Sequence, residues 1–288
     1  MGKHVGFIST RFAGTDGVSL EAAKWSEILE RSGHRCFWFA GDLDRDPERS
    51  LLVPEAFFKH ETNKIIDVEV FGRKWRSRET TQAIHDLRAL LKKRLYEFID
   101  RFQIDMLVAQ NLLTIPMHLP LGLAMTEVIA ETLIPTVAHH HDFYWERTRF
   151  SVNAVGDYLR MAFPPSLPTI QHVVINSSAD NQLSLRTGIS PTIIPNVMDF
   201  ENPPPIINRL DSCGPDSEKK EVSGDDYASD VRQALGLADD ELLILQPTRV
   251  VKRKGIEHAI ELTHRLGLKA KLVISHASGD EGYDYERR

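Results

Sequence analysis

Four cationic side chains lie between the end of a predicted strand and the start of a predicted helix. They are Arg249, Lys252, Arg253 and Lys254, and Gly255 follows them directly. Cations at a helix N-terminus are repelled by the helix dipole, so this arrangement is unfavourable unless an anion lies among them. A phosphate group would form charge-assisted hydrogen bonds with arginine and lysine. The segment therefore predicts a diphosphate-binding site, with a solvated cluster of charges as the alternative.

A second candidate is the run His139-His140-His141-Asp142, which follows the predicted strand 135–138. Ligands of open α/β sheets bind at the carboxyl ends of strands, so this position favours a polar active-site loop in which Asp142 orients one imidazole. Histidines with a purely structural role, bonded to the backbone, are the main alternative. A metal site is less favoured, because consecutive residues that leave a strand point in alternating directions and rarely converge on one ion.

The loop between the first predicted strand and the first predicted helix contains Gly14 and Gly17. Glycines let a backbone approach a ligand closely, and the N–H groups that begin the following helix attract anions. Glycines are common in such turns, so a structural role is an equal alternative. The spacing is not that of a dinucleotide fingerprint. Asp42 nevertheless follows the second predicted strand, where a dinucleotide enzyme holds its ribose, so an NAD-dependent oxidoreductase stays an alternative.

Asn196 and Asp199 follow a predicted strand at the point where the chain leaves the first predicted domain. A hinge and a ligand cleft tend to coincide at such a crossing, so both residues are candidates for a cleft or hinge role. The basic and aromatic loop 72–78 could contact an acidic acceptor or, peripherally, a membrane surface. A solvated loop is the favoured interpretation of that segment.

These segments lie on elements that alternate between short apolar strands and amphipathic helices, which is the pattern of βαβ units and a parallel sheet. The strands are predicted at 4–9, 36–40, 106–109, 135–138, 173–175 and 192–194. The helices are predicted at 18–31, 80–102 and 179–186. Together they predict an α/β fold in which residues 1–200 form one complete doubly wound, Rossmann-like domain.

The second half of the chain differs in character. Residues 201–230 are rich in proline, glycine, serine and mixed charges, so we expect a flexible linker. The α/β pattern then restarts, with helices predicted at 228–235 and 256–266 and strands at 242–246 and 271–275. Because a doubly wound domain needs roughly 100 residues, we expect residues 231–288 to form only the beginning of a second Rossmann-like domain.

The composition narrows the functional classes. A formal net charge of −6 at pH 7 argues against a general binder of nucleic acids or anionic membranes. Two cysteines, Cys36 and Cys213, are too few for a disulfide framework, and the apolar run around Cys36 is typical of a buried thiol. The N-terminus has no apolar signal-peptide core, and the most apolar stretch, 112–134, contains prolines and glutamates. We expect a cytoplasmic protein without a transmembrane segment.

The motifs occur in an order that resembles the family 4 retaining glycosyltransferases of GT-B fold. They are a glycine loop, His-Asp after a strand, Pro-Asn-x-x-Asp at the domain crossing and Arg-x5-Lys-Gly after the next strand. The resemblance covers the chain outside the linker. It implies that residues 1–200 form the acceptor-side domain and that residues 231–288 belong to the donor-side domain. It implies that the glycine loop with Gly14 and Gly17 lies near the donor phosphates. It also implies that His141, with Asp142 beside it, contacts the donor sugar, and that Arg249 and Lys254 bind the donor diphosphate.

The implied reaction moves a sugar from a nucleoside-diphosphate-sugar donor to a hydroxyl acceptor with retention at the anomeric carbon. Cationic side chains would stabilise the departing diphosphate, so no metal or cofactor is required. The family's Gly-Gly-Val and Pro-Asn-Gly become Asp16-Gly17-Val18 and Pro195-Asn196-Val197 in this chain. The family's Glu-x7-Glu segment does not occur before Arg288, so we expect the 288-residue chain not to transfer sugar by itself. A non-catalytic fragment that binds a sugar nucleotide is a further alternative.

Overall fold

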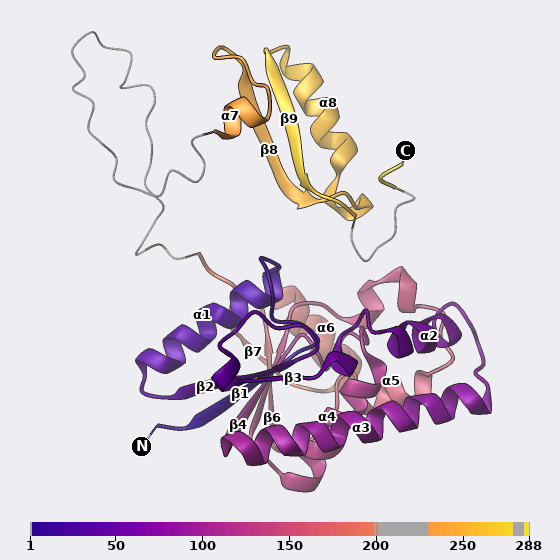
Figure 1. Cartoon of the computed structure of the whole chain (residues 1–288). Coiled ribbons are helices and arrows are strands. Elements are labelled where there is room, and N and C mark those ends of the chain that lie inside the picture. The colour runs from indigo at the N-terminus through magenta and orange to yellow at the C-terminus, as the bar shows by residue number, and fades with distance from the viewer. Residues whose placement is uncertain (1, 199, 201–229, 279–284, 288) are drawn as a thin grey trace. The chain divides into compact units, whose positions relative to one another are not determined.

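The computed structural model describes residues 2–198, 200, 230–278 and 285–287 (Figure 1). The chain divides into two compact units, Met1–Pro203 and Pro204–Arg288. Each unit is described here by itself. Two sequence predictions, the cleft residue Asp199 and the linker 201–230 up to residue 229, fall outside the described residues.

The first unit is built on a seven-stranded sheet with the order β3-β2-β1-β4-β5-β6-β7, and every neighbouring pair is parallel. The strands are β1 (His4–Ile8), β2 (Arg35–Ala40), β3 (Ser50–Leu52), β4 (Met106–Gln110), β5 (Thr136–His140), β6 (Ile170–Val174) and β7 (Thr192–Ile193). The helices are α1 (Gly17–Arg31), α2 (Glu61–Val70), α3 (Arg78–Phe102), α4 (Leu119–Thr132), α5 (Gly156–Ala162) and α6 (Ser177–Thr187). This arrangement confirms the predicted α/β fold class.

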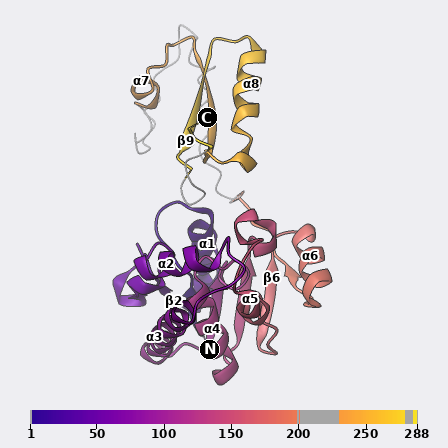
Figure 2. The ribbon, with the colours of Figure 1, turned by 90° about the vertical axis from the view of Figure 1, so that its right-hand side faces the viewer.

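Both faces of this sheet carry apolar side chains, as buried parallel strands require. Along β2, Cys36 and Trp38 pack with α1, whereas Phe37 and Phe39 pack with the opposite layer. Helix α1 covers one face and α3, α4 and α5 cover the other (Figures 1 and 2). Burial raises the pKa of the Cys36 thiol to about 12, so the predicted buried, unreactive thiol is confirmed.

Helix α3 forms where the sequence predicted an amphipathic helix. The hydroxyl of Ser77 caps its start by accepting from the Thr80 N–H at 3.0 Å. The predicted apolar stripe is buried, at Ile84, Leu87, Leu91, Leu95 and Phe98. A Cβ on Gly6 of β1 would lie 2.7 Å from the Phe98 ring, so this glycine lets the helix approach the sheet closely.

Several elements of the first unit differ from the prediction. Strand β5 continues through His139 and His140, which the sequence reading had assigned to a loop after residue 138. Helices α2 and α5 and strand β3 were not predicted. The sequence of α2 does not predict a helix, because polar Asn63 lies on the buried face beside Ile66 and Val70 and interrupts the apolar periodicity.

The second unit contains α7 (Val231–Ala234), β8 (Leu242–Arg249), α8 (Ile256–Leu266) and β9 (Ala270–His276) among its described residues. Strands β8 and β9 pair in parallel, and α8 has the predicted bounds. Strand β8 runs three residues beyond the prediction, through Pro247 to Arg249, with an irregular register after Gln246. Arg249 therefore ends a strand, while Lys254 ends the 3₁₀ turn Lys252–Lys254 that leads into α8.

Candidate active site

The strand order reverses between β1 and β4, because the chain moves outward from β1 to β2 and β3 and then returns to β4 on the other side. Ligands of open α/β sheets bind outside the carboxyl ends of strands at such a point. Here the loops that follow β1, β4 and β5 meet, and they carry the glycines, Asn111 and the pair His141-Asp142.

Asn111, directly after β4, fixes the backbone of the predicted catalytic pair. Its Oδ1 accepts hydrogen bonds from the His141 N–H at 3.1 Å and the Asp142 N–H at 3.3 Å. The residue has a φ of +48°, a left-handed conformation that costs free energy except at glycine but that asparagine tolerates better than most residues. Thr114, further along the same loop, donates from Oγ1 to the Asp142 carbonyl at 2.8 Å. Strained backbone held by such bonds is typical of functional sites.

The Asp142 carboxylate is paired with Arg147. Arg147 Nη2 lies 3.0 Å from Asp142 Oδ1 and 2.7 Å from Oδ2, and the amide nitrogen of Asn111 lies 3.5 Å from Oδ2. Both side chains are partly exposed. Charge-assisted bonds of this kind fix orientation, so Asp142 is a positioned carboxylate beside His141.

His141 lies on the α1 side of the sheet. Asn196 Nδ2 lies 3.4 Å from its Nδ1, so the amide donates and the imidazole carries its proton on Nε2. That Nε2 is buried and has no hydrogen-bond partner among the described residues. Burial lowers the pKa of His141, and the charges of Asp142, Glu21 and Asp16 oppose this shift, while Lys24 reinforces it. His141 is therefore a neutral hydrogen-bond donor beside the start of α1.

Asn196 is brought to this site by the segment that follows β7. Lys24 of α1 donates from Nζ to the Val197 carbonyl at 2.6 Å, which ties the segment to the helix. Of the two residues predicted at the domain crossing, Asn196 thus contacts His141, and Asp199 lies outside the described residues.

The other two histidines of the run have structural surroundings, which corrects the expectation of a histidine loop. His139 is fully buried, donates from Nδ1 to Gln110 Oε1 at 3.0 Å and stacks on Trp25 with ring centroids 4.5 Å apart. His140 points to the opposite face, where its Nε2 lies 2.9 Å from His172 Nδ1. Burial lowers the pKa of His139 to about 3 and that of His140 well below its usual value, so both are neutral.

The glycine loop contains the residue that accepts hydrogen bonds from the free N–H groups at the start of α1. Asp16 is the N-cap residue, and its Oδ1 accepts from the N–H groups of Val18 and Ser19 at 3.0 and 3.2 Å. Gly14 has a φ of +72° and donates its N–H to Asp44. A Cβ on Gly17 would meet nothing within 4 Å. The structure leaves space above Gly17, but a carboxylate of the protein already occupies the anion position of the helix.

The cationic segment of the second unit is arranged differently. The N-cap residue of α8 is Gly255, whose φ is +62° and which provides no side-chain cap. The Lys254 side chain is exposed, and its carbonyl accepts from Gln246 Nε2 at 2.9 Å. Arg249, half-buried, ends β8 and pairs in register with His276 of β9. Arg249 and Lys254 therefore lie near a helix start whose dipole attracts anions and whose N-cap residue, Gly255, provides no side-chain cap.

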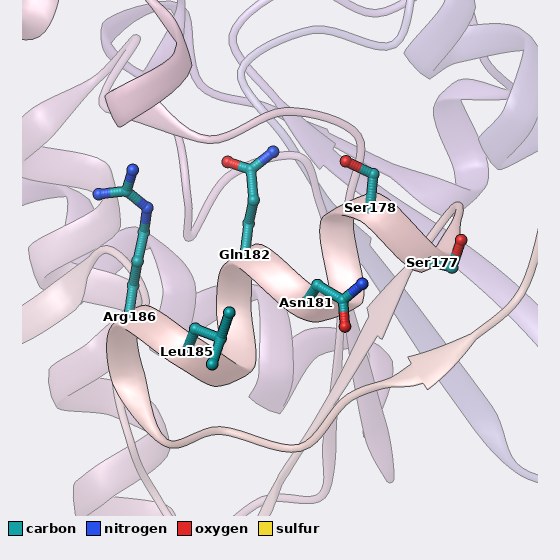
Figure 3. A pocket seen from close by; sticks show the side chains of 6 residues that line it. All are labelled: Ser177, Ser178, Asn181, Gln182, Leu185 and Arg186. Carbon is teal, nitrogen blue, oxygen red and sulfur yellow. The ribbon is translucent and has the colours of Figure 1, made fainter.

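A hollow of about 580 Å³ in the first unit is a poor candidate for the reaction centre. It is lined by residues of α6 alone, which are Ser177, Ser178, Asn181, Gln182, Leu185 and Arg186 (Figure 3). None of the predicted site residues lines it. Gln182 also accepts from the Trp145 indole at 2.9 Å, so part of this surface is used in packing.

Asn111, Arg147 and Glu21 belong to the site but were missed in the sequence. Asn111 follows Gln110 at the end of an apolar strand. Two polar residues at that position indicate a ligand site, and the sequence alone contains this signal. Glu21 is 5% exposed and accepts from the Trp25 indole at 3.2 Å, which only the tertiary structure reveals. Asn111, Arg147 and Glu21 lie in the first unit, whereas Arg249 and Lys254 lie in the second.

No family model matches the chain, but curated proteins do, and two of them match over most of its length. The chain is 29% identical over 267 residues to a mannosylglucosylglycerate synthase from Petrotoga mobilis, a match that covers 89% of this chain and 55% of that protein. It is 28% identical over 255 residues to a mannosylglucosylglycerate synthase from Thermotoga maritima, covering 87% and 54% respectively. The chain spans about half the length of these relatives.

Solved structures show the fold. A sucrose-phosphate synthase from Thermosynechococcus elongatus matches 99% of this chain and 66% of its own, with a TM-score of 0.58 and 13% identity. A glycosyltransferase from Rickettsia africae matches 100% and 63%, with a TM-score of 0.56 and 10% identity. The chain has a GT-B-like α/β fold. No described helix is long and apolar enough to cross a membrane.

Proposed function

We propose that this protein is a glycosyltransferase that moves a sugar from a nucleoside-diphosphate donor to a hydroxyl acceptor, with retention at the anomeric carbon. The observation that carries the proposal is the neutral His141, held with Asp142 by Asn111 at the switch point of a GT-B-like sheet. The similarity to two mannosylglucosylglycerate synthases over most of the chain supports it. These similarities do not favour an NAD-dependent oxidoreductase.

His141 contacts the transferring sugar in this proposal. A buried N–H without a partner costs about 1–3 kcal/mol, and a sugar oxygen would supply the missing acceptor at Nε2. Because the Asn196 amide donates to Nδ1, the tautomer that presents this N–H is fixed. Asp142, held by Arg147, keeps the loop that carries His141 in one arrangement, so the imidazole is positioned before the sugar arrives.

Arg249 and Lys254 bind the donor diphosphate. Two cations next to the start of α8 offer charge-assisted bonds and a positive helix end to the same anion. As the bond to the sugar breaks, negative charge grows on the diphosphate, and fixed cations stabilise that charge more than they stabilise the bound donor. This arrangement needs no metal ion.

The names of the relatives suggest the substrates. A mannosylglucosylglycerate synthase joins a mannosyl unit to a glucosylglycerate unit by name, so we propose a nucleoside-diphosphate mannose as donor and a glycoside such as glucosylglycerate as acceptor.

The first experiment is a thermal-shift screen of the 288-residue chain against GDP-, UDP- and ADP-linked sugars and NAD. A ligand that binds the folded state raises its stability by about 2.7 kcal/mol at one hundred times its Kd. We expect a shift with one class of sugar nucleotide and none with NAD. A shift with NAD alone would contradict the proposal. Transfer to glucosylglycerate is then measured with this chain and with any longer product of the same gene.

A further inference from the structure

A row of polar atoms on α2 has no role in the site described above. His60 is the N-cap residue of this helix and makes no side-chain cap. Asn63 and Asp67 follow it at helical spacing, so the three lie on one helix face. His60 Nδ1, Asn63 Oδ1 and Asp67 Oδ1 are all buried and have no hydrogen-bond partner among the described residues. Asn63 as a whole is 0% exposed. Because buried polar atoms are nearly always hydrogen-bonded, three on one face indicate contact with a polar ligand.

The remaining atoms of these side chains are held firmly. Asn63 Nδ2 donates to the carbonyls of Phe58 and Met117 at 3.0 and 3.1 Å, which turns its Oδ1 the other way. Asp67 Oδ2 accepts from Arg149 Nη2 at 2.9 Å, and Arg149 Nη1 lies 4.0 Å from the Met117 sulfur. Asn63 and Arg149 both contact Met117, and Arg149 pairs with Asp67. We call Asn63, Asp67 and Arg149 the α2 cluster.

The α2 cluster is joined to the candidate active site by two loops. The loop after β4 carries Asn111 and Thr114, which hold His141 and Asp142, and also Met117, which holds Asn63. The loop after β5 carries Arg147, which pairs with Asp142, and Arg149, which pairs with Asp67. A ligand at the α2 cluster thus lies within the same set of loops as the proposed reaction centre.

The chemistry of the α2 cluster suits sugar hydroxyls. Asn63 Oδ1 and Asp67 Oδ1 offer acceptors, and the Arg149 guanidinium, 38% exposed, offers donors, so a ligand there must both donate and accept. A hydroxyl group does both. Burial raises the pKa of Asp67 to about 7, while Arg149 opposes the shift. A carboxyl group with this pKa accepts a hydrogen bond from a hydroxyl when ionised and donates one when protonated, which suits a polyol.

We propose that the α2 cluster binds the hydroxyl groups of the glycosyl acceptor, with Asn63 and Asp67 accepting hydrogen bonds and Arg149 donating one. The inference rests on the proposed function for the identity of the ligand. It assigns the acceptor's hydroxyl groups to three named side chains outside the His141 site.

The test compares two positions on the same helix. Asp67→Leu replaces both carboxylate oxygens by methyl groups in the same branched arrangement. Glu69→Leu is its matched control, because Glu69 also forms an ion pair on α2, with Arg73 at 3.2 Å. Glucosylglycerate is the probe, in steady-state transfer and in calorimetric binding without donor. We expect Asp67→Leu and Arg149→Gln to raise the acceptor KM and Kd about tenfold or more, since each removes a bond to a charged group.

The donor KM and the slow hydrolysis of donor without acceptor should stay within about twofold of wild type in these variants. Glu69→Leu should change none of these values, and Asp67→Asn should restore part of the affinity. Transfer with an unchanged acceptor KM in both Asp67→Leu and Arg149→Gln would overturn the inference and leave the proposed function standing. A wild-type protein that binds sugar nucleotides but neither transfers to nor binds the acceptor would overturn both.

Discussion

The two units hold their candidate site residues in different ways. In the first unit, protein hydrogen bonds position the site, since Asn111 and Thr114 fix the backbone of His141 and Asp142, and Arg147 fixes the carboxylate. In the second unit, Lys254 is exposed on a 3₁₀ turn. The first arrangement is organised before a ligand arrives, and the second resembles a surface that a ligand would complete.

The same contrast appears at two helix starts. Both α1 and α8 follow a strand and a loop with glycine, and either could bind a phosphate. Asp16 caps α1 with its own carboxylate, which would repel an anion there, whereas the N-cap residue of α8, Gly255, provides no side-chain cap and follows three cations. The comparison therefore predicts that the diphosphate binds at α8 and that the start of α1 faces the sugar.

The largest expected effect is at His141. His141→Ala should lower kcat about a hundredfold or more and change the donor Kd little, because the Nε2–H contact is proposed to strengthen in the transition state. His139→Ala is the control, and it should cost melting temperature rather than turnover, because His139 stacks on Trp25 in the core. Equal losses of kcat at both positions would show that the two imidazoles have been assigned wrongly.

Acid should destabilise the first unit. Burial lowers the pKa values of His118 and His172 to about 4 and that of His139 to about 3, so each must bind a proton on unfolding below its unfolded pKa of about 6.5. Their stabilisation is complete above pH 6.5 and falls as the pH drops. Asp67, with its raised pKa, acts in the opposite direction but is a single group.

The expected loss of unfolding free energy between pH 7 and 5 is at least about 2 kcal/mol. Tryptophan fluorescence reports this change from the first unit alone, because the four tryptophans are Trp25, Trp38, Trp75 and Trp145. A fluorescence-detected stability that stays flat or rises over this range would contradict the neutral, buried state of the histidines.

The next effect concerns the second unit. Lys254→Ala should weaken binding of a nucleoside diphosphate about tenfold, since a charge-assisted bond to phosphate is worth roughly 1.5–3 kcal/mol, and Arg249→Ala should do at least as much. Arg265→Ala is the control, because Arg265 pairs with Glu261 on an exposed part of α8. If all three variants bind the nucleotide equally, the diphosphate lies elsewhere.

The smallest effect is expected at Gly17. A Cβ there meets nothing within 4 Å, so Gly17→Ala should fold normally and gain up to about 1 kcal/mol of stability at the first position of α1. Donor affinity should fall less than with Lys254→Ala. A loss of donor affinity larger than that of Lys254→Ala would reverse the comparison and place the phosphates at α1.

The sequence predicted those parts of the fold in which apolar periodicity is regular. Helix α3 and helix α8 followed from their stripes, and the buried strands followed from short apolar runs. It failed where polar residues are buried. Strand β5 contains His139 and His140, which hydrogen-bond to Gln110 and His172 on neighbouring strands. These partners lie far away in the sequence, so the local pattern around His139 and His140 does not reveal them.

The same limit applies to the site. His141, Asp142 and Asn196 could be singled out because they follow strands, and the structure brings them together. Asn111 and Arg147, which hold them, depend on contacts between loops after different strands. The proposed diphosphate residues Arg249 and Lys254 and the glycines Gly14 and Gly17 stay predictions.

The most direct test of the glycosyltransferase proposal is a ¹H NMR time course of the anomeric proton, with α-linked nucleoside-diphosphate mannose and glucosylglycerate as substrates. It is run with the 288-residue chain and with any longer product of its gene. The account predicts a new α-linked mannoside, formed as the nucleoside diphosphate is released. A β-linked product would contradict retention, and no transfer by either form under conditions where the donor binds would contradict the proposed function itself.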